Sequence, residues 1–197
     1  MITGGCGFIG SNLAILLKVK YPGYNIITLD NLKRRGSELN ISRLKDAGIQ
    51  FIHGDIRNPE DLNLDIQPDY IIDAAAEPSV MAGTGATLNY VINTNLNGTI
   101  NTLELAARTK AKFIFLSTSR VYPISYLDQI NYTESETRFL LSEIQQLQGI
   151  TKNGIREDFP LDKARSVYGS TKLASELIIE EFREFFDVPR RRFILRQ

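Results

Sequence analysis

Short apolar segments rich in β-branched residues alternate along this chain with longer segments whose apolar residues recur at helical spacing. The first kind predicts strands at residues 25–30, 50–53, 70–74, 112–117 and 192–195. The second kind predicts helices at residues 11–20, 37–46, 87–109 and 168–186. Because parallel strands need a crossover connection, the alternation predicts a doubly wound α/β fold, with a parallel sheet covered by helices on both faces.

The segment before the last predicted helix interrupts this alternation. It is polar and contains Pro123, Gly149, Gly154 and Pro160. We therefore expect one domain spanning residues 1–197, with a partly helical insertion at about residues 123–166. We also expect a shortened first strand, because only Met1, Ile2 and Thr3 precede a glycine-rich turn where about 5 to 6 residues would be usual.

Composition narrows the function classes. The 197 residues are 43% hydrophobic, enough for one well-cored domain. Positive and negative side chains number 23 each, so no net field attracts nucleic acid or an anionic membrane. Cys6 is the only cysteine, which excludes an internal disulfide and a cysteine-rich metal site. With no apolar run near the roughly 20 residues of a membrane span, we expect a cytoplasmic protein without metal, whose anion binding depends on a specific pocket.

A glycine-rich turn follows the first strand. Residues 3–11 read Thr-Gly-Gly-Cys-Gly-Phe-Ile-Gly-Ser, with Gly4, Gly7 and Gly10 around Phe8 and Ile9. A pyrophosphate needs such glycines, because the turn is tight and the backbone must approach the phosphates closely. The following helix then presents free amide groups and a partial positive charge. Taken alone, the pattern also fits a plain tight turn.

An acidic residue in the expected place favours a dinucleotide. Asp30 ends the second predicted strand, 20 positions after Gly10, where its carboxylate can accept hydrogen bonds from the adenosine ribose. A carboxylate there repels a 2′-phosphate, so we expect NAD rather than NADP. The alternative, pairing of such a phosphate with basic side chains, stays open because of the nearby Lys33, Arg34 and Arg35.

Further residues at the ends of predicted strands extend the cofactor site. Asp55 and Ile56 follow the third strand on the rim expected for adenine, and residues 74–76 (Ala74, Ala75 and Ala76) follow the fourth, where small side chains let a cofactor approach. His53 is the only histidine, and we interpret it as structural rather than catalytic.

The last predicted helix begins with a tyrosine and a lysine on one face. Tyr168 and Lys172 are four positions apart. An ammonium near a phenol should lower its pKa from about 10 and make it an acid or base near neutral pH. Hydroxyls also end the fifth predicted strand, where ligands bind in such sheets, so Ser117, Thr118 or Ser119 could contact a substrate oxygen. Their other reading is capping of the strand end.

Together these motifs resemble the extended short-chain dehydrogenase/reductases, the NAD-dependent epimerase/dehydratase family. The resemblance covers essentially the whole chain, in the family's order, and rests on the glycine turn, Asp30-Asn31-Leu32, residues 54–57, residues 95–104, Ser117-Thr118 with Val121-Tyr122, and Tyr168-x-x-x-Lys172. It implies a Rossmann fold, bound NAD contacted by Asn31 among others, and Thr118, Tyr168 and Lys172 as the catalytic residues.

Within that family, Asp30-Asn31-Leu32, residues 115–123, residues 132–138 and the long insertion look like the CDP-paratose (CDP-tyvelose) 2-epimerases. The resemblance implies that a CDP-linked sugar hydroxyl is oxidised to a keto-sugar, which turns over and is reduced on its other face. Tyr168 would move the hydroxyl proton, Thr118 would hydrogen-bond the reacting oxygen, and Lys172 would tune the tyrosine and hold the ribose. A homo-oligomer is compatible with this reading.

Three departures from the family pattern keep alternatives open. Asp73 replaces the usual histidine before the small residues of the fourth strand, and Pro123 stands where glycine commonly follows Val-Tyr. Thr118 and Tyr168 are 50 positions apart, about twice the spacing in UDP-galactose 4-epimerases. We expect the family's carboxyl-terminal substrate domain to be largely missing, and the chain as given to bind NAD weakly without turning over a nucleotide sugar. The alternatives are a 4-epimerase, a 4,6-dehydratase, which Ser119-Arg120 disfavours, and a non-catalytic NAD-binding fragment.

Overall fold

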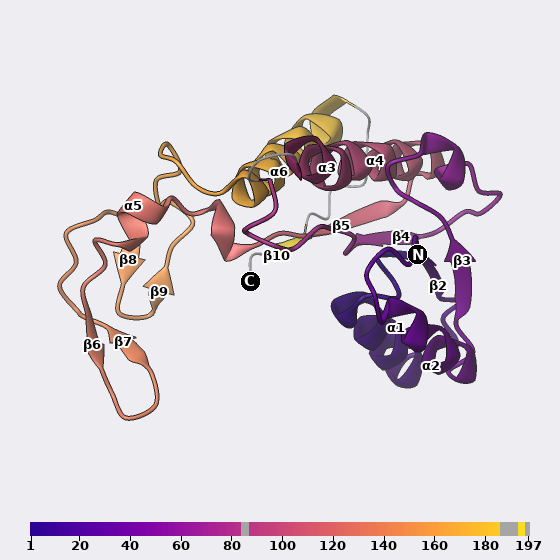
Figure 1. Cartoon of the computed structure of the whole chain (residues 1–197), viewed down its shortest axis with the longest axis horizontal. Helices are drawn as coiled ribbons and strands as arrows, with labels where there is room; N and C mark the ends of the chain where they lie inside the picture. The colour runs from indigo at the N-terminus through magenta and orange to yellow at the C-terminus, as the bar shows by residue number, and fades with distance from the viewer. Residues whose placement is uncertain (84–86, 186–192, 196–197) are drawn as a thin grey trace.

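In a computed structural model, which describes residues 1–83, 87–185 and 193–195, the centre of the protein is a six-stranded parallel sheet (Figure 1). Its strand order is β3-β2-β1-β4-β5-β10. This is the predicted doubly wound arrangement, in which the order reverses between β1 and β4. The strands are β1 (Ile2–Thr3), β2 (Ile27–Asp30), β3 (Gln50–His53), β4 (Tyr70–Asp73), β5 (Lys112–Leu116) and β10 (Phe193–Leu195).

Helices cover both faces of the sheet. Figure 1 shows α1 and α2 on one face and α3, α4 and α6 on the other. Their bounds are α1 (Phe8–Lys20), α2 (Asn40–Asp46), α3 (Leu88–Ile92), α4 (Gly98–Thr109) and α6 (Val167–Phe185). Single 3₁₀ turns are η1 (Ser37–Leu39), η2 (Pro59–Leu62) and η5 (Ser119–Val121).

Two predicted helices differ from their expected form. Helix α1 begins at Phe8, before the expected residue 11, because Gly7 already caps it in an extended conformation. The single helix expected at residues 87–109 is divided into α3, the π-helical turn η4 (Asn93–Asn97) and α4. Asn95 lies in that turn, and its side-chain oxygen accepts a hydrogen bond from the backbone amide of Glu77 at 2.7 Å. The expected ends at Phe186 and Arg192 lie outside the described residues.

The alternation of side chains along the strands divides the apolar core between the two faces. Towards α4 and α6 the core contains Leu29, Ile71, Leu103, Phe113 and Phe115 among others. Towards α1 and α2 it contains Ile2, Cys6, Ala14, Ile26, Leu44 and Ile49. The sheet is thus buried on both faces, as parallel sheets require, and its carboxyl edge is the place left for a ligand.

The expected insertion combines one short helix with two short β-hairpins. It contains the four-residue helix α5 (Ile124–Leu127) and two hairpins, β6 (Tyr132–Glu134) with β7 (Phe139–Leu141) and β8 (Ile150–Thr151) with β9 (Gly154–Ile155). Figure 1 shows this region extending away from the end of the sheet. Gly149 and Gly154 have φ of 78° and 138°, conformations that favour glycine. Gly149 directly precedes β8, and Gly154 begins β9.

Candidate functional site

A groove of about 490 Å³ lies at the carboxyl ends of the strands. Every residue predicted to bind the dinucleotide lines it: Gly4, Gly7, Phe8, Ile9, Gly10, Asp30, Asn31, Asp55, Ile56, Ala74, Ala75, Ala76, Tyr168 and Lys172. A larger hollow of about 880 Å³ lies near the amino-terminal ends of the strands. It contains none of the predicted site residues, and ligands of such sheets bind at the carboxyl ends, so the smaller groove is the candidate site.

The glycine turn is built to bring backbone into this groove. Gly4 has φ of +63°, and a Cβ atom there would lie 2.8 Å from the carbonyl oxygen of Ala74. A Cβ at Gly10 would lie 2.2 Å from the oxygen of Gly4. At Gly7 a Cβ would meet only the oxygen of Gly4, at 3.1 Å. Internal packing therefore requires glycine at positions 4 and 10, whereas the free space at Gly7 belongs to the groove.

Asp30 fixes the glycine turn as well as facing the groove. One carboxylate oxygen accepts a hydrogen bond from the backbone amide of Cys6 at 3.0 Å, and the other accepts from the amide of Leu32 at 2.8 Å. Each oxygen keeps a second acceptor position. The carboxylate can therefore order the loops on both sides of it while still accepting from a ribose hydroxyl.

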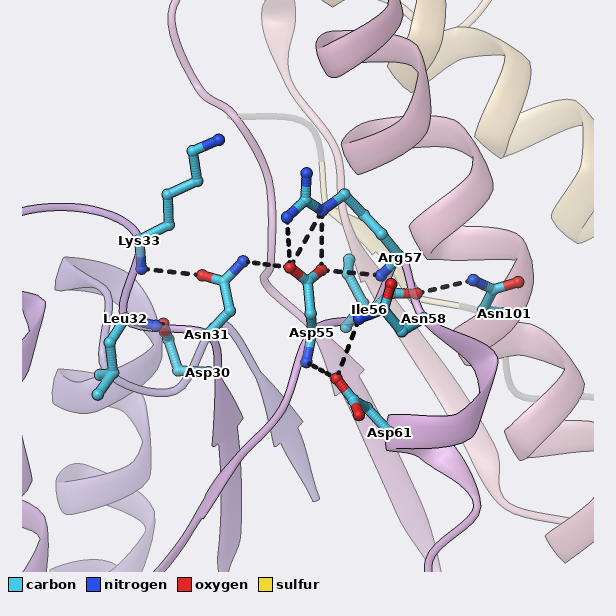
Figure 2. A network of polar contacts seen from close by, with 10 residues as sticks. All are labelled: Asp30, Asn31, Leu32, Lys33, Asp55, Ile56, Arg57, Asn58, Asp61 and Asn101. Atoms are coloured by element: carbon cyan, nitrogen blue, oxygen red, sulfur yellow. Dashed lines mark hydrogen bonds and ion pairs between the residues drawn. The ribbon is translucent and has the colours of Figure 1, made fainter.

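The adenine rim predicted at Asp55 is a linked network of side chains (Figure 2). Asn31 donates to Asp55 at 2.9 Å, and Arg57 donates through both Nε and a terminal nitrogen. Burial pushes the pKa of Asp55 upward, but the hydrogen bonds from Arg57 and Asn31 outweigh it and lower the pKa to about 2. Asp55 is thus a fixed anion at the rim, and each of its oxygens already accepts at least two hydrogen bonds within the protein.

The basic loop after β2 divides between the groove and solvent. Lys33 and Arg34 line the groove, whereas Arg35 is exposed outside it. The Lys33 ammonium lies 3.7 Å from the centre of the Tyr90 ring, and a terminal nitrogen of Arg34 lies 3.7 Å from a Glu77 carboxylate oxygen. Two of the cations that could pair with a 2′-phosphate thus have partners within the protein.

The three candidate hydroxyls after β5 have different surroundings. Ser117 lines the groove and donates to the buried carboxylate of Glu176 at 2.5 Å. Thr118 is buried and shares a side-chain hydrogen bond with Tyr168. Its oxygen also accepts from the amide of Arg120 at 3.2 Å, so it serves as a cap too. Ser119 is exposed at the first position of η5. The structure brings only Thr118 into contact with the tyrosine.

The expected lowering of the pKa of Tyr168 is wrong. Burial raises the pKa of Tyr168 above its ordinary value, while the hydrogen bond with Thr118 and the charge of Arg120 act in the opposite direction. Lys172 is not among these contributors. Its ammonium lies 3.8 Å from the centre of the Phe115 ring, on the side of the buried sheet. One helical turn of spacing therefore places the two side chains together without making one the electrostatic partner of the other.

Sequence reasoning missed three residues that line the groove, one each from α3, η4 and the loop after β4. Tyr90, Thr94 and Glu77 all line it. The Thr94 hydroxyl is buried and has no hydrogen-bond partner within the described structure. Tyr90 and Thr94 are four positions apart, so helical spacing could have placed them on one face. His53, interpreted as structural, is exposed and does not line the groove.

The groove fits a dinucleotide by two independent observations. The space beside Gly7 lets a ligand reach the backbone at the start of α1, where helix amides lack partners within the helix. The unpaired Thr94 hydroxyl offers a buried polar group that a ligand would satisfy. In the described residues there is no cluster of His, Cys, Asp and Glu that could hold a metal, and no helix there is long and apolar enough to cross a membrane.

Comparison with known proteins identifies relatives over nearly all of the chain. The family described as "NAD dependent epimerase/dehydratase family" matches residues 1–191. CDP-paratose 2-epimerase from Salmonella typhi is 33% identical over 193 residues, covering 94% of this chain and 53% of that protein. A dTDP-glucose 4,6-dehydratase from Streptomyces niveus is 35% identical over 130 residues, covering 62% of this chain and 38% of that protein.

Solved structures agree with the fold. UDP-glucuronic acid 4-epimerase from Bacillus cereus, in complex with UDP-glucuronic acid and NAD, has a TM-score of 0.70 and 27% identity, covering 99% of this chain and 55% of that one. A dTDP-glucose 4,6-dehydratase from Bacillus anthracis in complex with NAD has a TM-score of 0.67 and 26% identity, covering 99% and 53%. The chain spans about half the length of the curated relatives first matched, at 53% for each.

Proposed function

Because this chain belongs to the NAD-dependent epimerase/dehydratase family, we propose that it is the NAD-binding part of a nucleotide-sugar epimerase. The observation that supports this best is the place of the Thr118–Tyr168 hydrogen bond beside a groove lined by the glycine turn. A nucleotide-binding groove alone would suit any dinucleotide-binding fragment. A buried phenol paired with a hydroxyl is the arrangement that proton transfer needs.

NAD would be held by the glycine turn, by Asp30 at the ribose and by the Asp55 rim. When bound, it supplies the hydride acceptor and donor and adds a positive charge to the groove. The Asp30 carboxylate accepts hydrogen bonds from the backbone amides of Cys6 and Leu32. In the proposed complex it also accepts hydrogen bonds from the ribose hydroxyls and repels a 2′-phosphate. The cofactor preferred by this groove is therefore NAD rather than NADP.

The chemical work assigned to this chain is proton transfer at Tyr168 Oη. The phenolate form takes the proton of a sugar hydroxyl and later returns it, so no net proton is consumed in epimerisation. Thr118 stabilises the phenolate by donating to it, which is the direction of its effect on the pKa of Tyr168. Because burial raises that pKa, the base needs positive charge in the groove beyond that of Arg120, which a bound NAD would add.

The finer assignment is epimerisation at C2 of a CDP-linked dideoxyhexose. It is supported by the likeness to CDP-paratose 2-epimerase over 94% of the chain and by the long insertion between Thr118 and Tyr168. A 4-epimerase is the second candidate, favoured by the fold similarity to UDP-glucuronic acid 4-epimerase. The exposed Ser119 and Arg120 stand where a 4,6-dehydratase would need an acid and a base, which disfavours dehydration.

The test compares substrates and one hydroxyl. Purified protein, as this chain and as the full gene product, is incubated with NAD and CDP-paratose, CDP-tyvelose or UDP-glucuronic acid, and the sugar is followed by proton NMR. We expect inversion at C2 of the CDP-sugars in the full product. Tyr168→Phe should abolish it while NAD binding measured by calorimetry stays within about threefold. Tyr70→Phe removes a phenol hydroxyl at the amino-terminal end of β4, away from the groove. It should change neither the inversion nor the affinity for NAD.

Each outcome has a distinct meaning. Inversion at C4 of the UDP-sugar would replace the 2-epimerase by the 4-epimerase. Turnover by Tyr168→Phe at the unmodified rate would remove Tyr168 from the mechanism. Absence of turnover in every substrate, with NAD bound normally, would leave a binding protein without the proposed activity.

A further inference from the structure

Three ionisable side chains from two elements meet behind the floor of the groove. Asp73 ends β4 and is 0% exposed, while Lys172 and Glu176 lie one turn apart on α6 and are 2% and 4% exposed. Such groups are almost never fully buried unless they are paired. The position of Asp73 is also the one at which the family resemblance predicts histidine.

The surroundings of Asp73 fix its place but leave its charge uncompensated locally. One carboxylate oxygen accepts from the hydroxyl of Thr3 at 2.6 Å, and the other accepts from the hydroxyl of Thr99 at 2.9 Å. Both donors are neutral. A fully buried carboxylate is costly without an opposite charge nearby, and hydroxyl donors satisfy its hydrogen bonds without supplying that charge.

The sheet register brings Lys172 to this carboxylate. Asp73 is directly opposite Phe115 in the pairing of β4 with β5. The Lys172 ammonium lies 3.8 Å from the centre of the Phe115 ring. The ammonium is therefore held over the strand position next to Asp73, and Lys172 also lines the groove, so one side chain connects the buried carboxylate with the ligand site.

The electrostatic balance at Lys172 depends on the buried carboxylates. Burial lowers the pKa of Lys172 to about 8, and the charges of Asp73 and then Glu176 raise it against that effect. Among the described residues, these are the charged groups that act on the ammonium. Of the other neighbours, β5 contributes the uncharged ring of Phe115, and burial raises the pKa of Tyr168, which lies one turn earlier on α6. Glu176 is already engaged by the Ser117 hydroxyl.

We propose that Asp73 is a positioning residue that holds Lys172 as a cation at the floor of the groove. Its catalytic meaning rests on the proposed function, because a cationic Lys172 would add positive charge to the groove and donate hydrogen bonds to ribose hydroxyls. The electrostatic effect of Asp73 on Lys172 does not rest on the proposed function, because the charge of Lys172 can be measured in the chain alone. In this chain a buried anion takes the position at which relatives are expected to have an imidazole.

The test is a titration of Lys172 in the 197-residue chain. Lysine labelled with ¹³C at Cε is followed by NMR from pH 6 to 11, and the Lys172 signal is identified by its loss in Lys172→Arg. We expect a midpoint about 8 in the unmodified chain. Asp73→Asn keeps the shape and should lower that midpoint by at least one pH unit, a tenfold change in proton affinity. Glu176→Gln is the matched variant and should lower it by less.

A second readout links the charge to the ligand. NAD affinity measured by calorimetry should fall as pH rises through the Lys172 midpoint, and Asp73→Asn should move that fall to lower pH by the same interval. Asp73→His, the residue expected from the family, is neutral above pH ~7 and should behave like Asp73→Asn. It also replaces Asp73→Asn if circular dichroism shows that the asparagine variant does not fold.

The outcomes separate this inference from the proposed function. A Lys172 midpoint within 0.3 units of the unmodified one, in a folded Asp73→Asn or Asp73→His chain, would overturn the role of Asp73 and leave epimerisation untouched. A lowered midpoint together with full activity in Tyr168→Phe would support the role of Asp73 and overturn the proposed proton transfer at Tyr168. A larger shift in Glu176→Gln than in Asp73→Asn would give the positioning role to Glu176 and overturn the inference as stated.

Discussion

Gly7 and Gly10 provide a sharp test of the glycine turn, because the structure assigns them different roles. A Cβ atom at Gly10 would lie 2.2 Å from the carbonyl oxygen of Gly4 and 2.9 Å from the Cα of Gly5. Both neighbours are backbone of the same loop and cannot rotate away. At Gly7 a Cβ would meet one atom at 3.1 Å, and its φ of −69° suits alanine. Alanine at position 10 therefore disturbs folding, whereas alanine at position 7 fills ligand space.

The magnitudes follow from this difference. Overpacking in a well-packed region costs about 1 to 3 kcal/mol, and the Gly10→Ala contact should be at the upper end. In a chain of this size, about 1 kcal/mol shifts the melting temperature by roughly 2 to 4 °C, so Gly10→Ala should lower it by about 6 to 12 °C. For Gly7→Ala, the smaller crowding is offset by about 0.4 to 1 kcal/mol from the restricted unfolded chain, and the expected shift is within about 2 °C.

Thermal unfolding by circular dichroism and NAD titration by calorimetry separate the two effects. Both variants should bind NAD at least tenfold more weakly than the unmodified chain. Gly23→Ala is the control, because a Cβ there has nothing within 4 Å, and it should change neither quantity. A Gly10→Ala chain that melts like the unmodified one would refute the packing argument. Normal NAD affinity in Gly7→Ala would show that the phosphates do not approach the backbone at that residue.

Three further predictions concern single side chains. NAD should bind at least tenfold more tightly than NADP, and Asp30→Ala should shrink that ratio in calorimetric titrations; tighter NADP binding by the unmodified chain would give the decisive role to Lys33 and Arg34. The pKa of Asp55, about 2, is depressed, so its contribution on the order of 2 kcal/mol is present above the ordinary aspartate pKa and is lost as pH falls towards 2; urea unfolding of Asp55→Asn should differ from the unmodified chain at pH 7 and converge with it near pH 2. Burial raises the pKa of Cys6 to about 12, so its thiol should resist a disulfide reagent at pH 8 in the folded chain and react fully in urea.

Much of the fold was predictable because its signals are local. The period of the apolar residues located the strands, and the strand ends gave the groove-lining residues Asp30, Asp55 and Ala74–Ala76, since the carboxyl ends of parallel strands share one edge. The π turn within residues 87–109 was not predictable in the same way. It depends on Asn95 bonding to Glu77, 18 positions away, and no periodicity in the sequence encodes that contact.

The hairpins within the insertion were not predictable for a related reason. Its helix α5 has four residues and its hairpin strands have two or three, lengths too short for either period to be visible. What organises it is tertiary: the Phe159 ring packs edge-on against Tyr122 and Tyr126, with centroids 5.3 and 6.0 Å apart. Proline and glycine marked a break in the regular pattern correctly, but they did not say which structure replaced it.

The candidate catalytic residues show how sequence spacing and electrostatics diverge. A separation of four positions correctly placed Tyr168 and Lys172 on one face of a helix, and it suggested that the lysine lowers the pKa of the tyrosine. The structure instead couples the lysine to Asp73, a residue 99 positions earlier in the chain, and couples the tyrosine to Thr118 and Arg120. Burial, which spacing cannot reveal, raises one pKa and lowers the other. It brings the pKa of the phenol above that of the ammonium, which reverses their usual order.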